Sequence, residues 1–249
     1  MAKLLHDFEE FIKNDTYFVF DDFDHYVTAD TFTTTATNSG TVAVSDGAAG
    51  IVRLTPSDGT VADNDETYMH GTTELFKFAT DKPMIFTAKV RPVSTTIAET
   101  NLIIGLKDAV AADSVLDDGG GPAASYSGAL FAKLDGGTKW VCETSVSTSQ
   151  TTVTSDHVVG NNAWDVLVIE TKPISSTVTE VHFYTADVQS DGSFSLADVG
   201  KTTAGTQFVA QTITHTSATE MEICFGVKNG AITNSNLLDV DWVYCAQKR

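Results

Sequence analysis

The sequence is poor in basic residues, and this shortage limits the partners that the protein can have. It holds 15 lysine and arginine residues against 33 aspartate and glutamate residues, so the net charge is −18 over 249 residues. Phosphate backbones and anionic lipid surfaces repel a chain with this charge. We therefore expect neither nucleic acid nor a membrane as a direct partner.

Cysteine is also scarce. The three cysteines, Cys142, Cys224 and Cys245, stand far apart, with no CxxC pair and no paired histidine spacing. Zinc sites and disulfide frameworks need closer or even-numbered sets. The pattern indicates small buried hydrophobic side chains in a reducing compartment.

Long apolar runs are missing throughout. The first residues, MAKLLHDFEEFIKNDT, do not resemble a secretory signal, and no later stretch approaches the roughly 20 apolar residues of a membrane span. We expect synthesis in the cytoplasm of the cell that makes the protein, without secretion by the usual route.

Recognisable catalytic and cofactor motifs are absent as well. The sequence has no GxSxG, no P-loop, no GxGxxG that opens a helix, and no HxH or HExxH among its six histidines. The sequence therefore predicts a protein that is not an enzyme and binds no cofactor.

One short segment has helical periodicity. Apolar residues recur on one helical face near the N-terminus, and Asn14 and Asp15 follow them. A helix this short needs something to dock on, either its own domain or a neighbouring subunit. We predict a helical arm over residues 1–16 whose contact residues are Leu4, Leu5, Phe8, Phe11 and Ile12.

From residue 17 onward, apolar residues alternate with polar ones, as in half-buried strands. In the segment EMEICFGVK, Met221, Ile223, Phe225 and Val227 lie on one face, and LLDVDWVYC predicts a shared face for its alternate apolar residues. Turn-forming residues separate many such segments, and threonine is abundant. The fold class is therefore all-β, an antiparallel β-sandwich or jelly roll over residues 17–249.

The stretch FVFDDFDHYVTADTF is the densest group of acids and aromatic rings. Asp22, Asp24 and Asp30 carry oxygen ligands suitable for Ca²⁺. Aspartate is equally typical of an exposed corner at the end of a strand, where it caps turns. We favour the structural interpretation and keep calcium as a weak alternative.

A second weak calcium candidate begins at Asp187 and includes Asp191. Its spacing nearly matches a calcium loop, but Gln189 replaces the usual third ligand and Asp198 replaces the bidentate glutamate. A strand-like segment precedes it, so a hairpin turn explains the same residues.

Glycoside hydrolysis and sugar stacking are the remaining candidates. Hydrolysis needs two carboxyl groups on one face, and the available pairs are Asp22/Asp24, Glu220/Glu222 and Asp239/Asp241. We interpret Glu222, Asp239 and Asp241 as outward residues of ordinary alternation, because they lie opposite strongly apolar faces. Trp140, Trp164 and Trp242 are in phase with apolar neighbours, so we predict that they belong to the core.

Six strand-like segments follow one another along the chain: FVFDDFDHY, FTAKVRP, IIGLKD, ALFAKLDGGTKWVCETS, AWDVLVIETK and MEICFGVKNGAITNSNLLDVDWVYCAQKR. In this order they resemble the successive strands of concanavalin A-like (LamG-like) jelly rolls, above all those of tailed-bacteriophage structural proteins. The related laminarinase-like enzymes carry Glu-x-Asp-x-x-Glu, and no glutamate here is followed two places later by aspartate.

The resemblance implies a structural role in a virus. Phage proteins of this kind decorate the capsid exterior, often as trimers, and hold the major capsid protein in place. The expectation is a capsid decoration (cement) protein on the virion, with the N-terminal arm as its docking or trimer-forming element. The alternative is a carbohydrate-binding, lectin-like module for adhesion or receptor binding.

Overall fold

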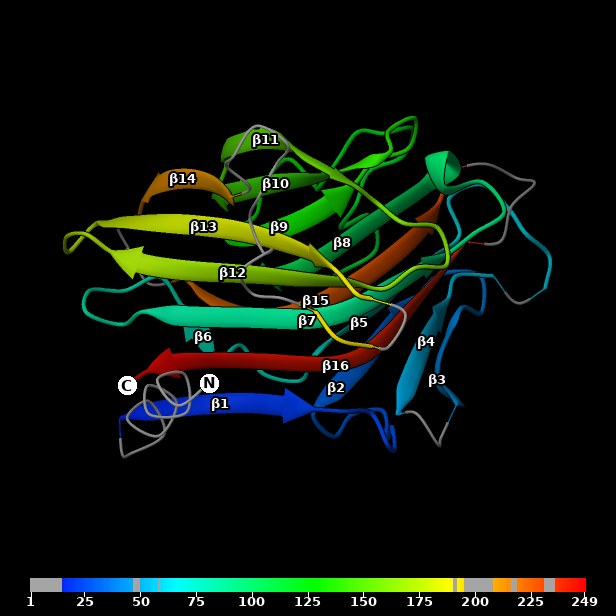
Figure 1. Ribbon diagram of the computed structural model, residues 1–249, viewed down its shortest axis with the longest axis horizontal. Coiled ribbons are helices and arrows are strands. Elements are labelled where there is room, and N and C mark those ends of the chain that lie inside the picture. Colours follow the sequence, from blue (N-terminus) through cyan, green and yellow to red (C-terminus); the bar gives the residue numbers. More distant parts are fainter. Residues whose placement is uncertain are drawn as a thin grey trace.

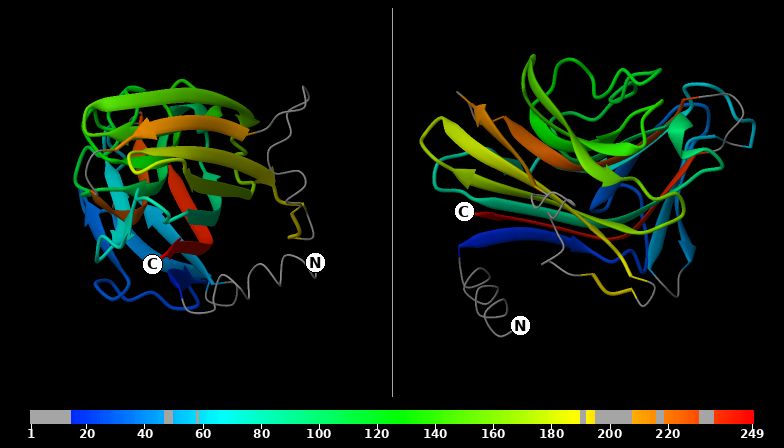
Figure 2. Two further views of the ribbon diagram at one scale, coloured as in Figure 1. Left: turned by 90° about the vertical axis from the view of Figure 1, so that its left-hand side faces the viewer. Right: turned by 45° about the horizontal axis from the view of Figure 1, so that its top comes forward.

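The computed structural model describes residues 15–46, 50–57, 59–189, 192–194, 208–215, 219–230 and 236–249. In this part of the chain, strands form two antiparallel sheets that are layered face to face (Figures 1 and 2). The single helix among these residues is the 3₁₀ helix η1 (Ile97–Glu99). Residues 1–14 of the predicted helical arm, with Leu4, Leu5, Phe8, Phe11 and Ile12, lie outside the described residues. The predicted end of the arm at residue 16 was wrong, because Thr16 already begins a strand that runs to Asp21.

Sheet A contains eight strands. Its order is β14 (Phe208–Thr214), β13 (Val178–Asp187), β12 (Asp165–Pro173), β7 (Met84–Val93), β16 (Leu237–Lys248), β4 (Ile51–Thr55) and β3 (Thr41–Asp46). The first strand, β1 (Thr16–Asp21), pairs with the last strand, β16, so the two ends of the sandwich domain lie side by side (Figure 1).

Sheet B also contains eight strands. Its order is β11 (Ser149–Val158), β10 (Lys139–Val146), β9 (Gly128–Lys133), β8 (Thr100–Lys107), β15 (Glu220–Asn229), β5 (Glu66–Gly71) and β2 (Phe32–Ala36), and β6 (Phe76–Lys77) pairs with β15. β11 and β2 are therefore at opposite ends of this sheet.

The core lies between the sheets and follows the predicted alternation. Met221, Ile223, Phe225 and Val227 of β15 are at most 3% exposed and face the core. Trp140 is fully buried there, as predicted. The all-β antiparallel sandwich is confirmed.

A β-bulge changes the predicted face of the last strand. The β16–β7 register shifts between Val240 and Trp242, so Val240 faces the core before the bulge and Val243 faces it afterwards. Trp242 and Tyr244 consequently lie on the outer face of sheet A. The prediction that they share a core face with Val240 was wrong.

Trp164 also lies outside the core, beside the outer face of sheet A. The Arg91 guanidinium stacks 4.6 Å from the centre of its ring and the Lys89 ammonium lies 5.1 Å away. The prediction that Trp164 and Trp242 belong to the core was therefore wrong. Their rings contact other rings or cations instead of being buried between the sheets.

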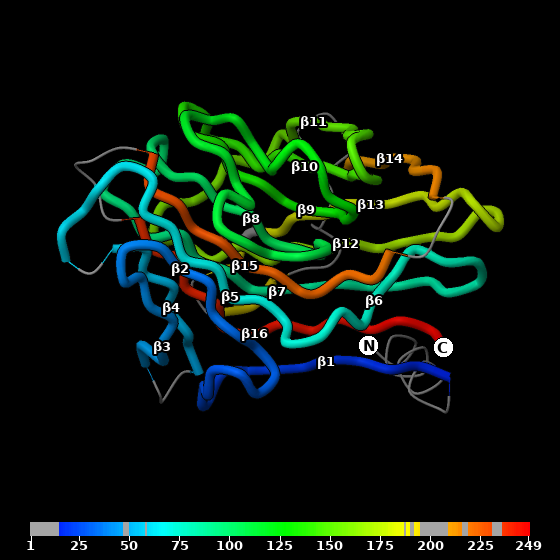
Figure 3. Tube along the Cα trace, turned by 180° about the vertical axis from the view of Figure 1, so that it is seen from behind, coloured from blue at the N-terminus to red at the C-terminus, as the bar shows by residue number. Residues whose placement is uncertain are grey.

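The outer face of sheet B is covered by residues 108–127, which connect β8 to β9. Val115 and Tyr126 of this connection are buried against Tyr68 and Leu130 of the sheet. Figure 3 shows the connection in green, over the strands of this face. No described helix is long and apolar enough to cross a membrane.

Candidate functional site

A groove runs along one side of the sandwich, between β1 of sheet A and β2 of sheet B. It consists of two adjoining hollows of about 310 and 260 Å³, which share Asp30, Thr31 and Phe32. We call it the side groove. Its acidic end includes Asp21, Asp22, Asp24, His25, Tyr26 and Asp30, and its apolar end includes Val19, Leu75, Phe76 and Ile223.

The turn after β1 shapes the acidic end. The Asp21 carboxylate accepts a 2.8 Å hydrogen bond from the Phe23 N–H, which closes a local turn of the type that aspartate favours. Phe23 takes a left-handed backbone conformation, with φ of 52°, and its fully buried ring packs 5.7 Å from Phe32. A bulky residue rarely adopts this conformation, so buried packing holds the turn in a strained shape.

Gly50 keeps the same corner narrow from the other side. Its φ is +62°, and a Cβ atom placed on it would lie 2.2 Å from the Asp22 carbonyl oxygen. Only glycine fits this close approach. The acidic end is thus fixed by two constraints, the Phe23 turn and the Gly50 contact.

The acidic end contains four carboxylates and one histidine. His25 Nδ1 lies 2.5 Å from an Asp24 carboxylate oxygen, and both side chains are more than 70% exposed. The hydrogen bond that the His25 ring donates to the Asp24 carboxylate raises the pKa of His25. The side chains of Asp22 and Asp30 are exposed and make no hydrogen bond or ion pair with other described residues.

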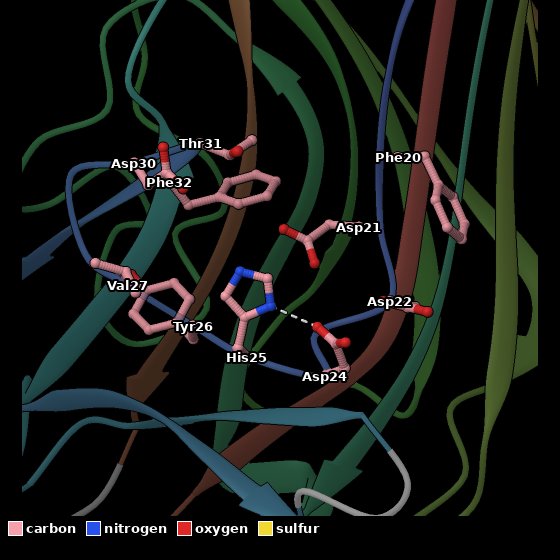
Figure 4. Close-up of a pocket in the computed structure, with 10 residues that line it drawn as sticks. All are labelled: Phe20, Asp21, Asp22, Asp24, His25, Tyr26, Val27, Asp30, Thr31 and Phe32. Atoms are coloured by element: carbon pink, nitrogen blue, oxygen red, sulfur yellow. Dashed lines mark hydrogen bonds and ion pairs between the residues drawn. The ribbon is translucent and has the colours of Figure 1, made fainter.

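Figure 4 shows how these groups point. The Asp21 carboxyl group and the His25 ring are directed into the hollow, whereas the Phe20 ring points away from it. Burial raises the pKa of Asp21, and the charges of Asp22 and Asp24 add to this effect. The hollow therefore presents carboxylate acceptors beside the ring of Tyr26.

The other end of the side groove has an apolar floor. Phe32, Phe76 and Ile223 are at most 3% exposed, and Leu75 at the rim is 44% exposed. Thr72 donates a 2.9 Å hydrogen bond to the Asp30 carbonyl and so joins this end to the acidic one. Apolar walls with a few polar groups are typical of small-molecule sites.

The predicted calcium residues do not form a ligand set. Asp22, Asp24 and Asp30 line one hollow, but no three acidic, histidine or cysteine side chains in the described part of the chain are arranged to hold a metal ion. Of the second candidate, Asp187 ends β13 and Asp191 lies outside the described residues.

In two of the three carboxylate pairs considered for hydrolysis, Glu220/Glu222 and Asp239/Asp241, each carboxylate has its own partner. Glu222 is 6% exposed and lies 2.9 Å from His70, while Glu220 lies 3.4 Å from Lys77. Asp239 is fully buried between Arg53 and Arg91, and Asp241 pairs with Lys89 at 2.6 Å. Glu222 and Asp239 do point outward, but they are not solvent-exposed as ordinary alternation implies.

Sequence reasoning identified only half of the side groove. The acidic stretch is dense enough to notice, whereas Leu75, Phe76 and Ile223 are ordinary apolar residues far away in the chain. The pairing of β1 with β16 and of β2 with β5 brings them beside the acids. No local pattern in the sequence indicates that these apolar residues lie beside the acidic stretch.

Comparisons with known proteins show similarity in structure alone. No family model matches the sequence, and no curated protein is similar to it in sequence. The fold is a concanavalin A-like sandwich. Solved structures that it resembles include lectin II from Ulex europaeus, with a TM-score of 0.59 and 12% identity over 95% of this chain and 100% of the lectin.

Two further solved structures are similar to this chain, and their names describe an enzyme and a module of a phage protein. An endo-1,3-beta-glucanase from Streptomyces sioyaensis has a TM-score of 0.57 and 14% identity over 94% of this chain and 97% of the enzyme. The CBM2 module of the evolved Dit of Lactobacillus casei BL23 phage J-1 has a TM-score of 0.51 and 11% identity over 94% of this chain and 97% of the module. At these identities the similarity establishes the fold.

Proposed function

We propose that the protein is a non-enzymatic carbohydrate-binding module and that the side groove holds the glycan. The observation that carries the proposal is the groove itself, in which exposed carboxylates adjoin an aromatic ring and an apolar floor. Carboxylate oxygens accept hydrogen bonds from sugar hydroxyls, and rings offer apolar faces to a sugar ring. The lectin and phage-module neighbours support this function more than they support capsid binding.

The charge of the groove narrows the ligand class. Asp21, Asp22, Asp24 and Asp30 face one histidine, and the whole chain carries −18. Glycans that bear sialic acid, uronic acid or sulfate are therefore repelled. The ligand is a neutral glycan with several free hydroxyl groups.

A glycan array with matched variants tests this function. We expect neutral glycans to bind, Tyr26→Ala and Asp24→Asn each to weaken binding about tenfold or more, and Tyr26→Phe to retain most of it because the ring remains. Asp156→Asn, an exposed change on β11, serves as the control. The proposal fails if the wild-type protein binds no glycan or if Asp24→Asn and Asp156→Asn behave alike.

Capsid decoration stays a prediction and is the second candidate function. The phage origin of one similar module favours a virion protein, either on the capsid exterior, bound as a trimer to the major capsid protein, or at an adhesion site. Mass spectrometry of purified particles distinguishes these, since a decoration protein has a fixed, high copy number relative to the capsid protein. Deleting residues 1–16 tests the arm, which should be needed for capsid binding or trimer formation while the sandwich stays folded.

A further inference from the structure

The edge strand β11 of sheet B has features of a strand that pairs with another chain. It is ten residues long, residues 149–154 are all exposed, and among the strands that the structure describes it pairs only with β10. Edge strands that must stay unpaired usually carry lysine, proline or a bulge. The segment SQTTVT at residues 149–154 carries no charge and no proline.

The geometry of the hairpin shows which backbone groups face outward. Val146 pairs with Ser149 across a two-residue turn, and such a closing pair exchanges both of its hydrogen bonds. Alternate residues after Ser149 therefore turn their N–H and C=O groups away from β10. These are Gln150, Thr152 and Thr154, and their main-chain groups have no hydrogen-bond partner among the described residues.

The ladder is regular only where these outward groups lie. The β10–β11 register is continuous from Val146↔Ser149 to Val141↔Thr154, and it shifts beyond Thr154. A bulge at that point ends the usable edge. The free edge is thus a short segment with three outward residues, centred on Thr152.

This segment is complementary to itself. Two copies related by a two-fold axis at Thr152 place Thr152 opposite Thr152, and Gln150 opposite Thr154 in both directions. Each pair exchanges two main-chain hydrogen bonds, and threonine side chains match well across antiparallel strands. Because the segment is uncharged, two copies of a protein with charge −18 can approach here without direct contact between like charges.

We propose that β11 is the self-association edge of the protein and that two copies join their B sheets through Ser149–Thr154 into one continuous sheet. The nearest carboxylate, Glu143, does not oppose this, since it is 5% exposed and already accepts hydrogen bonds from Tyr126 and Thr152. β2 and the side groove lie at the opposite end of sheet B. Pairing therefore leaves both grooves open and makes the particle bivalent.

Sedimentation equilibrium on the full chain tests the proposal with a matched pair of variants. The interface is small, so we expect a wild-type dimer with a Kd on the order of 10 to 100 μM. Thr152→Pro removes the outward N–H and leaves the β10 ladder intact, and should raise the Kd about 30-fold because two hydrogen bonds are lost at the axis. Thr152→Ala loses the same hydroxyl contact with Glu143 but keeps the N–H, and should remain a dimer.

A disulfide trap locates the contact independently. The Cα atoms of paired residues across such an axis lie about 5.5 Å apart, which suits a disulfide, so Thr152→Cys should oxidise to a covalent dimer. Cys142, Cys224 and Cys245 are at most 1% exposed and do not compete. Ser176→Cys, exposed in the β12–β13 turn, should not cross-link. A monomeric wild type, equal association of Thr152→Pro and Thr152→Ala, or equal cross-linking of the two cysteine variants would overturn the proposal.

Discussion

Carboxylates occupy two regions of this molecule in opposite ways. On the outer face of sheet B, Glu66, Glu143 and Glu222 are at most 6% exposed beneath residues 108–127. In the side groove, Asp22, Asp24 and Asp30 are exposed. Carboxylates on the outer face of sheet B hold the structure together through hydrogen bonds, whereas carboxylates in the side groove are accessible to a ligand.

The buried set fastens residues 108–127 to the sheet. Glu66 accepts hydrogen bonds from the Asp113 N–H and from the Tyr68 hydroxyl, and its carboxylate lies 3.5 Å from the Lys228 ammonium. Glu222 likewise accepts from the Val110 N–H at 2.9 Å. Each carboxylate oxygen replaces lost water with a protein donor, as buried charges require.

Accessibility decides which region a ligand can use. A glycan would have to displace residues 108–127 and break these hydrogen bonds before it reached Glu66 or Glu222, whereas Asp22 and Asp30 in the groove have only water to lose. The comparison therefore supports binding in the side groove and a stability role for the covered face.

The largest expected effect comes from unpairing the buried set. Lys228→Met leaves the Glu66 carboxylate buried without its cation and also removes the 2.7 Å hydrogen bond from Lys228 to the exposed Asp113 carboxylate. It should lower the free energy of unfolding by about 3 to 5 kcal/mol, mainly through the buried Glu66. Asp24→Asn in the groove should change it by less than about 0.5 kcal/mol. Urea unfolding measures both, and similar losses in the two variants would break the comparison.

The double variant sharpens this result. Lys228→Met combined with Glu66→Gln removes both buried charges, so it should recover part of the loss. The opposite outcome is a double variant whose free energy of unfolding is lower still, by the amount that Glu66→Gln costs alone. In that case the contribution of Lys228 to stability does not come from its pairing with Glu66.

A substitution at Gly50 should have the next largest effect on stability, because Gly50 packs against the backbone of the turn that shapes the acidic end of the side groove. Gly50→Ala forces a Cβ atom against the Asp22 carbonyl and should cost about 2 to 4 kcal/mol while weakening glycan binding. Gly136→Ala is the matched control, with a similar φ of +76° and no atom within 4 Å of its added Cβ. It should cost only about 1 kcal/mol and leave binding unchanged. Equal melting temperatures for the two variants would contradict this account.

Much of the fold could be predicted from the sequence, because strand burial follows a period of two that each segment displays locally. The bulge at Trp242 could not, since one extra residue in a ladder depends on pairing with β7. The burial of Glu222 was missed for a related reason. Residues 108–127 have turn-like composition and no periodicity that says which sheet face they cover.

Lys133 gives a pH test of the covered regions. It is fully buried and donates hydrogen bonds to the Ala98 and Thr100 carbonyls, and burial lowers its pKa to about 8. Between pH 8 and 10.5 the unfolded chain therefore holds a proton that the folded chain has lost, so the free energy of unfolding rises with pH in this window, by about 3 kcal/mol. Chemical denaturation at several pH values should show the rise in wild type and a flatter profile in Lys133→Met.

His25 is the exposed counterpart of Lys133, and its effect should be the smallest. The Asp24 hydrogen bond raises the pKa of His25, so the folded state binds this proton more tightly and the resulting stabilisation is present below pH 6.5 and lost as the pH rises through the folded pKa. Solvent screens the pair because both side chains are largely exposed. NMR titration should find the pKa of His25 above 6.5 in wild type and near 6.5 in Asp24→Asn, with little change in melting temperature. A large loss of stability in Asp24→Asn would mean that the groove carboxylates stabilise the fold as Glu66 does. The contrast between the two regions would then disappear.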